Sequence, residues 1–246
     1  LVLLILSGCT TLVAVLNHDA LFGPEHPKEL VASSAPLTVD YERHVRPILE
    51  RRCLTCHGCY DSPCQLKLES YQGLLRGGSK TPVYNATRLS PAPLTRMFED
   101  AQSTAEWRDL GFHPVLHERA NTPQANLQAG LVARLLELKQ QHPLPASKLL
   151  GPEFELSADR AHQCPRIEEF DAYAAAKPLA GMPYGLPGLS TAEHRTLQTW
   201  LANGAPIAAE KPLTASLARE VALWESLFNQ DSLKHQLSAR YVYEHL

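Results

Sequence analysis

The sequence has nearly equal numbers of acidic and basic residues and few aromatic residues. Its 246 residues include 23 Lys and Arg against 26 Asp and Glu, so the formal net charge is −3. This balance excludes the basic surface that is typical of nucleic-acid-binding proteins. Phe, Trp and Tyr make up only 7% of the chain, and no segment shows the strong alternation of a half-buried strand. With 19 prolines, the chain is predicted to be mainly α, with helices joined by Pro-rich loops.

Long apolar runs are missing after the first residues. Residues 1–16 (LVLLILSGCTTLVAVL) carry no charge but are too short for a full membrane span. We interpret residues 1–20 as a signal or anchor segment whose own start is missing, which places the rest of the chain in an oxidising compartment. The string LSGC at 6–9 is similar to a bacterial lipobox and would put a lipid on Cys9. A plain cleaved signal or an uncleaved anchor is the alternative.

Cys53-Leu54-Thr55-Cys56-His57 is a C-x-x-C-H motif, the attachment motif of c-type haem. Two thiols one helical turn apart reach the two vinyl groups of one haem, and the imidazole that follows ligates the iron. We therefore expect haem c bound covalently through Cys53 and Cys56, with His57 as the proximal iron ligand.

The same cysteines allow two other interpretations. Cys53, Cys56, Cys59 and Cys64 could offer four thiolates to an iron–sulfur cluster or a zinc ion, or could form two disulfides. If haem takes the first two, the other two flank a turn, and we expect a local Cys59–Cys64 disulfide. Cys164 then remains as an inert buried thiol, a reactive thiol, or the partner of a cysteine outside this chain.

The second axial ligand is predicted to be Met182. The chain has only two methionines, and Met182 stands in an irregular Gly- and Pro-rich loop, 181–189, directly before a capped helix at Ser190–Asn203. Small c-type cytochromes have this order of haem motif, methionine loop and closing helix. Met97 is interpreted as a core side chain. His113 and His117 are the alternative ligands, although Pro114 between them argues against a regular helical pair.

Helix patterns divide the chain into parts. Helices are expected over 39–51, from the Ser103 capping box, from Thr122-Pro123 as one helix through Leu138, over Ser190–Asn203, and as a final pair after Thr214. The expected organisation is 1–20 signal or anchor, 21–37 linker, 38–80 haem-attachment part of a cytochrome c-like domain, 81–175 insertion with short helices, 176–210 distal-ligand loop and closing helix, and 211–246 the start of a further, truncated helical region.

Four segments resemble the bacterial fatty acid cis/trans isomerases: Val39–Gly78, Asp100–Leu116, Gly181–Pro206 and Asp231–Leu246. The strings CHGCYDSPCQLKL and QSTAEWRDLGF are the most specific of them. The first and third segments also resemble a wider class of cytochrome c-like domains. Because members of the isomerase family are considerably longer than this chain, the resemblance implies that it is the N-terminal part of such an enzyme.

The resemblance implies a periplasmic isomerase that converts cis double bonds in the acyl chains of membrane phospholipids to trans, in place and without net redox change. It implies haem on Cys53 and Cys56 and iron on His57, through which the reaction would run; Met182 as a ligand is inferred from the loop alone. As a mechanism, we expect ferric haem to withdraw electron density transiently from the double bond. The expected partners are phospholipids, the c-type haem maturation machinery and the C-terminal part of the same polypeptide, with no nucleic acid.

Two other functions use the same motif. A periplasmic c-type cytochrome domain for electron transfer would need the same haem site, but the long insertion at 81–175 fits it poorly. A haem-based stress sensor would need a signalling domain, and none is visible in the sequence.

Overall fold

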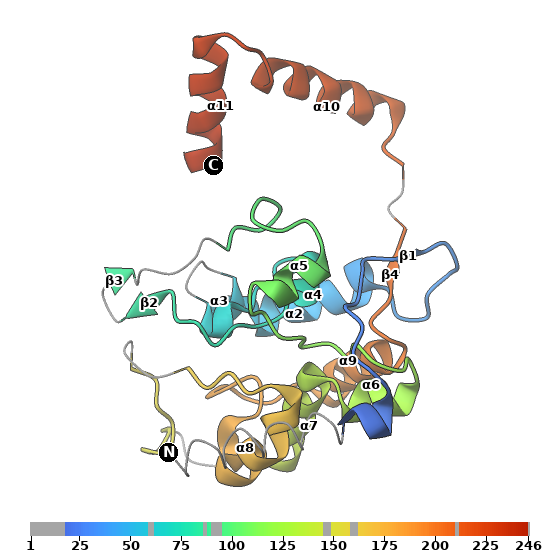
Figure 1. The fold of residues 1–246 in the computed structure, drawn as a ribbon, viewed down its shortest axis with the longest axis vertical. Helices are drawn as coiled ribbons and strands as arrows, with labels where there is room; N and C mark the ends of the chain where they lie inside the picture. The colour runs from blue at the N-terminus through green and yellow to red at the C-terminus, as the bar shows by residue number, and fades with distance from the viewer. Residues whose placement is uncertain are drawn as a thin grey trace. The chain divides into compact units, whose positions relative to one another are not determined.

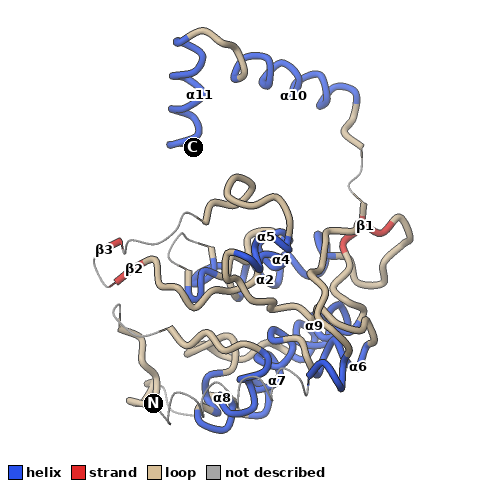
Figure 2. Tube along the Cα trace, in the orientation of Figure 1, coloured by secondary structure: helices blue, strands red, loops and turns tan. Residues whose placement is uncertain are grey.

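The protein is mainly helical, as predicted (Figures 1 and 2). A computed structural model describes residues 18–58, 62–85, 88–89, 95–144, 149–157, 162–209 and 212–245. The predicted signal segment and the lipid on Cys9 therefore lie outside the described residues. Contacts divide the chain into two units, Leu1–Ala208 and Ala209–Leu246, which are described separately. Within the described residues, none of the helices has the length and apolar character needed to span a membrane.

The first unit consists of short helices joined by long loops. Its helical elements in chain order are η1 Tyr41–Val45, α2 Arg46–Arg52, α3 Leu54–His57, η2 Pro63–Gln65, α4 Tyr71–Arg76, α5 Thr104–Asp109, α6 Pro123–Gln128, α7 Leu131–Gln141, η3 Ile167–Glu169, α8 Phe170–Ala176, η4 Pro178–Ala180 and α9 Thr191–Ala202. Strand β1 (Ala32–Ser33) pairs in parallel with β4 (Ile207–Ala208), with Ala32 opposite Ile207. Strand β2 (Tyr84–Asn85) pairs antiparallel with β3 (Arg88–Leu89).

The helix that precedes the haem motif changes its winding at a proline. Residues 41–45 form a π-helical turn, and the α-helix begins at Arg46. Pro47 is the second residue of α2, and because it has no N–H it cannot donate to a carbonyl of the preceding π-helical turn. The Asp40 carboxylate accepts from the backbone N–H of Arg43 at 2.8 Å and fixes the start of the helical run.

The closing helix α9 begins and ends where its sequence predicts. Ser190 Oγ accepts from the N–H of Glu193 at 3.2 Å, and Glu193 Oε2 accepts from the N–H of Ser190 at 2.9 Å. This reciprocal capping box satisfies two N–H groups that the helix cannot bond internally. After the helix, Gly204 takes a φ of +81°, which suits glycine and reverses the chain.

One predicted helix is wrong, because it is two helices. The leucine pattern from Thr122 to Leu138 predicts a continuous helix, but α6 ends at Gln128 and α7 starts at Leu131. Gly130 separates them with an extended backbone, and a Cβ at this position would lie only 2.5 Å from the carbonyl oxygen of Asn126. The break lets the N–H of Val132 bond to Val115 at 3.0 Å. Apolar spacing continues across such a break and therefore cannot reveal it.

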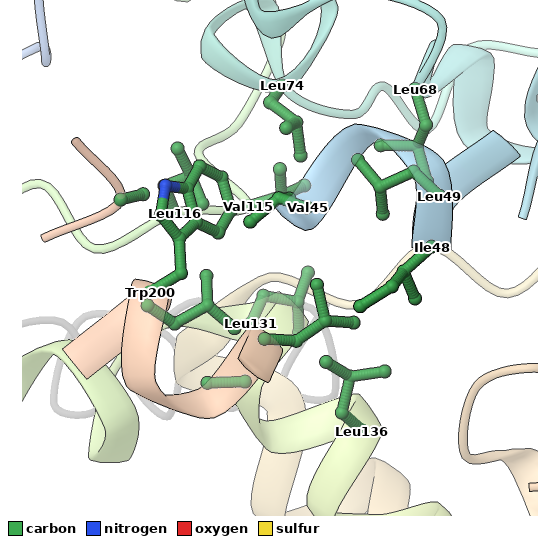
Figure 3. Close-up of a cluster of buried hydrophobic side chains, with 14 of the residues drawn as sticks. Val45, Ile48, Leu49, Leu68, Leu74, Val115, Leu116, Leu131, Leu136 and Trp200 are labelled. Carbon is green, nitrogen blue, oxygen red and sulfur yellow. The ribbon is translucent and has the colours of Figure 1, made fainter. Parts of the chain in front are cut away.

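The core packs η1 and α2, near the beginning of the first unit, against α9 near its end. Figure 3 shows Ile48 of α2 near Leu136 of α7, Leu49 of α2 beside Leu68, and Trp200 of α9 beside Leu116. Three aromatic rings also meet in this core: Tyr41, Tyr71 and Trp200 have ring centroids 5.4–6.4 Å apart. The Tyr71 hydroxyl donates to the carbonyl of Ala205, and Trp200 Nε1 donates to that of Pro206, both at 2.8 Å. The aromatic groups therefore hold the chain directly after α9.

The second unit is the predicted final pair of helices. Thr214 caps α10 (Ala215–Phe228), and α11 (Leu233–His245) follows it. Trp224 and Phe228 stack on α10 with ring centroids 5.6 Å apart. None of the described side chains of α10 is buried.

Lys139 is an anomaly in the packing of α7. Its side chain is 2% exposed, and its Nζ has no hydrogen-bond partner among the described residues. The loop after η4 covers it, since Gly181 lies so close to the backbone of Lys139 that a Cβ there would collide with it. Burial lowers the pKa of Lys139 below 10.5, because an amine removed from water is disfavoured in its charged form. The side chain therefore destabilises the native state.

We predict that Lys139→Met stabilises the protein by about 1–3 kcal/mol at neutral pH, the usual cost of a buried polar group without a partner. At Lys139 the folded state binds fewer protons than the unfolded state. The free energy of unfolding of the wild type therefore rises as the pH approaches 10.5, and its difference from that of Lys139→Met becomes smaller. Urea unfolding at pH 7 and pH 10 measures both effects. The exposed Lys234→Met variant is the control, and a destabilised Lys139→Met protein would contradict the interpretation.

Candidate functional site

The haem motif and Met182 line one cavity. This cavity has a volume of about 910 Å³, and Cys53, Cys56, His57 and Met182 all contribute to its wall. Most other lining side chains are apolar, and they come from α2, α4, α7, α9 and the loops between them, including Leu49, Leu68, Leu74, Leu131, Leu135, Leu136, Leu197 and Leu201. Its size is within the range of cofactor and ligand sites. The structure thus brings together all four predicted site residues, although Met182 is far from the motif in sequence.

Two bonds to the chain segment 66–68 fix His57. The carbonyl of His57 accepts from the N–H of Leu68 at 2.9 Å, and the His57 Nδ1 lies 3.0 Å from the carbonyl oxygen of Leu66. A carbonyl oxygen only accepts, so Nδ1 carries the proton in this bond and Nε2 has a lone pair free to bind a metal. Burial lowers the pKa of His57, which keeps the imidazole neutral. A hydrogen bond of this kind is the usual support of a metal-bound histidine.

The two motif thiols are not linked to each other. Cys53 and Cys56 are both free, with Cys53 as the N-cap of α3 and Cys56 within this helix. Burial raises the pKa of the Cys53 thiol to about 11, while Arg52 acts weakly in the opposite direction. Cys53 is therefore a protonated thiol, and Cys56 is exposed. Their spacing and their position on the cavity wall suit covalent attachment of one ring system.

The Met182 loop is bonded to both neighbouring helices. The N–H of Met182 donates to the carbonyl of Leu135 on α7 at 3.0 Å. Arg52 Nη2, on the residue directly before the motif, donates to the carbonyls of Pro187 and Gly188 at 2.8 and 2.7 Å. Arg52 thus joins the two parts of the wall. Sequence reasoning missed this role, because nothing local to Arg52 indicates a contact 135 residues away.

The structure separates the two histidines that were the alternative ligands. His113 lines the cavity and is 4% exposed, and its Nδ1 has no partner among the described residues. Burial, with smaller effects from Arg166 and Lys80, lowers the pKa of His113 to about 4. His117 is not part of the cavity wall, and its Nε2 lies 3.1 Å from the carbonyl oxygen of Ala120. Of these two histidines, only His113 is therefore placed where a cavity ligand could meet it.

Met97 packs against the small cluster of Ala101, Trp107 and Phe112. It is absent from the cavity wall. Its interpretation as a core side chain is confirmed.

The predicted disulfide is wrong. Cys64 forms a disulfide with Cys164, with the two Cα atoms 5.5 Å apart, rather than with Cys59, which lies outside the described residues. The sequence favoured the near neighbour because proximity along the chain was the only available guide. Both bonded cysteines line the cavity. Cys164 is therefore neither a reactive thiol nor the partner of a cysteine outside this chain, and Cys64 is not available as a thiolate for a four-cysteine metal site.

Comparison with protein families decides the class of the protein. A model of the fatty acid cis/trans isomerase family matches residues 92–246, which is more than half of the chain. The chain belongs to the fatty acid cis/trans isomerase family. It is an isomerase, and the matched part contains His113, Cys164 and the Met182 loop. The matched range begins after the C-x-x-C-H motif, so it does not bear on the haem.

Comparisons with curated proteins and with solved structures give no match.

The disulfide yields a direct prediction. Peptide mapping without reductant should recover a peptide pair linked through Cys64 and Cys164, and reduction should lower the free energy of unfolding by about 2–4 kcal/mol, because the bond closes a loop of 100 residues. A Cys64→Ser/Cys164→Ser variant should match the reduced protein and become insensitive to reductant. Recovery of a Cys59–Cys64 peptide instead would restore the prediction from sequence.

Proposed function

We propose that this isomerase converts cis double bonds in the acyl chains of membrane phospholipids to trans, in place, at a haem c held in the 910 Å³ cavity. Family membership supports the isomerase activity. The observation that carries the rest is the meeting of the C-x-x-C-H motif and Met182 on one cavity wall. A cytochrome c-like arrangement, with a proximal histidine and a distal methionine loop, accounts for that meeting.

The residues present fit a covalently bound haem. Cys53 and Cys56 are free thiols at the motif spacing, and the hydrogen bond from Nδ1 leaves His57 Nε2 unprotonated. The leucines of the wall suit a large flat apolar ring. The disulfide on the same wall supports export, because structural disulfides persist in oxidising compartments. We therefore propose a periplasmic location, loading by the c-type haem maturation machinery, and membrane association through residues 1–20 or a lipid on Cys9.

The reaction needs no proton donor or acceptor from the protein. Conversion of cis to trans breaks no σ bond and moves no atom to another molecule, so it requires only temporary weakening of the π bond. A bound ferric haem would supply an electron acceptor for this weakening, with no net redox change overall. His57 would hold its iron, Cys53 and Cys56 would hold its ring, and the leucines of the cavity wall would position the acyl chain and exclude water.

Met182 lines the cavity and would serve either as a second protein ligand of a bound haem or as a side chain of the acyl-chain pocket. A haem held by both His57 and Met182 would also suit an electron-transfer cytochrome, which is the alternative function. Family membership favours the isomerase.

We predict that the wild-type chain, produced in a host that attaches c-type haem, keeps its visible haem spectrum after denaturation, whereas Cys53→Ala/Cys56→Ala loses the haem. Incubated with cis-monounsaturated phospholipid vesicles, the loaded wild type should form trans lipid, and the double variant should form none. A Cys64→Ser/Cys164→Ser variant is the control for loss of cysteines elsewhere on the cavity wall.

Three results would count against the proposal in different ways. Retained haem without trans product under any redox condition would leave electron transfer as the function. Absence of attached haem in the wild type would remove both functions. Trans product from the Cys53→Ala/Cys56→Ala protein would separate the isomerase activity from the haem.

A further inference from the structure

Two segments meet over one side of the cavity. The described segment 149–157 packs on the Met182 loop: the Phe154 and Tyr184 ring centroids lie 5.7 Å apart, and the N–H of Glu155 donates to the Tyr184 hydroxyl oxygen at 3.1 Å. These contacts hold the two segments together although neither is helical there.

Leucines on both segments reach from the cavity to the solvent. Leu156 and Leu186 line the cavity and are also 52% and 44% exposed. Leu150 lies next to them, since the side chains of both Leu150 and Leu156 lie within 3.6 Å of the point where a Cβ on Gly185 would stand. A single exposed leucine is ordinary on a protein surface. Three neighbouring leucines that continue into an apolar interior form a patch of the kind that binds ligands.

We propose that Leu150, Leu156 and Leu186 form the entrance through which one acyl chain of a phospholipid reaches the cavity. This inference rests on the proposed function and names the part of the site that admits the substrate. The entrance leads into a cavity lined mainly by apolar side chains, which suits an apolar, narrow and flexible group. An acyl chain has these properties and a folded protein partner does not. The family's substrate, a fatty acid chain, agrees with this occupant.

The entrance is tested with charge on its rim. Leu156→Glu/Leu186→Glu places two carboxylates at the entrance. An acyl chain that passes them would remove water from these charges, which costs free energy. Leu30→Glu/Leu110→Glu is the matched control, because these leucines are 43% and 45% exposed and absent from the cavity wall. The full chain with attached haem is used throughout, and its haem spectrum and thermal unfolding show that each variant is folded.

Two measurements on dioleoylphosphatidylcholine vesicles follow. We expect Leu156→Glu/Leu186→Glu to form trans lipid with kcat/KM lowered about tenfold or more, mainly through KM, because the entrance contributes binding and takes no part in the bond rotation. For the second measurement, the vesicles contain a trace of phosphatidylcholine with a spin label on its acyl chain. The spectrum of the label should contain an immobilised component with the wild type and the control, and little or none with Leu156→Glu/Leu186→Glu.

The two measurements separate the entrance from the function. Normal turnover and normal immobilisation in Leu156→Glu/Leu186→Glu would overturn the entrance and leave the isomerase proposal intact. A wild type that immobilises the probe but forms no trans lipid would defeat the proposed function, while the spin label still reports whether the leucines admit the chain. A wild type that forms trans lipid but does not immobilise the probe would also overturn the entrance.

Discussion

The site depends on how the His57 turn is held. Its imidazole is fixed by the carbonyl of Leu66 and its main chain by the N–H of Leu68, so the turn is fixed by a segment that is itself part of the core. These two bonds set the protonated nitrogen and the direction of the ring. The free Nε2, the two cysteines and the apolar wall become a site only because the ring cannot turn away.

The Met182 loop is positioned by a longer chain of contacts. Met182 is held by Leu135, and Arg52 bonds to the carbonyls at 187 and 188 from a position next to the motif. Capping of α9 by Ser190 then fixes the end of the same loop. The Cys64–Cys164 bond closes a further side of the cavity. The Arg52 hydrogen bonds and the disulfide thus join segments that are 135 or 136 and 100 residues apart, respectively.

Local chemistry could be predicted from the sequence, and long-range pairing could not. The caps at Ser103, Ser190 and Thr214 and the ends of α9 follow from residue types within one turn of each other. The placement of Met182 in the same cavity as the motif followed from the order of segments along the chain. The Cys64–Cys164 bond, the break at Gly130 and the role of Arg52 depend on contacts made only after folding, and sequence spacing favoured a different answer for the first two.

The central claim is that the motif and the Met182 loop hold one haem between them. The absorption spectrum of the ferric protein tests this most directly, because methionine bound to ferric haem gives a long-wavelength charge-transfer band that histidine does not. The account predicts this band in the wild type and in His113→Phe, and its loss in Met182→Ala. An identical spectrum in wild type and Met182→Ala would remove Met182 from the iron, and a change only in His113→Phe would place His113 there instead.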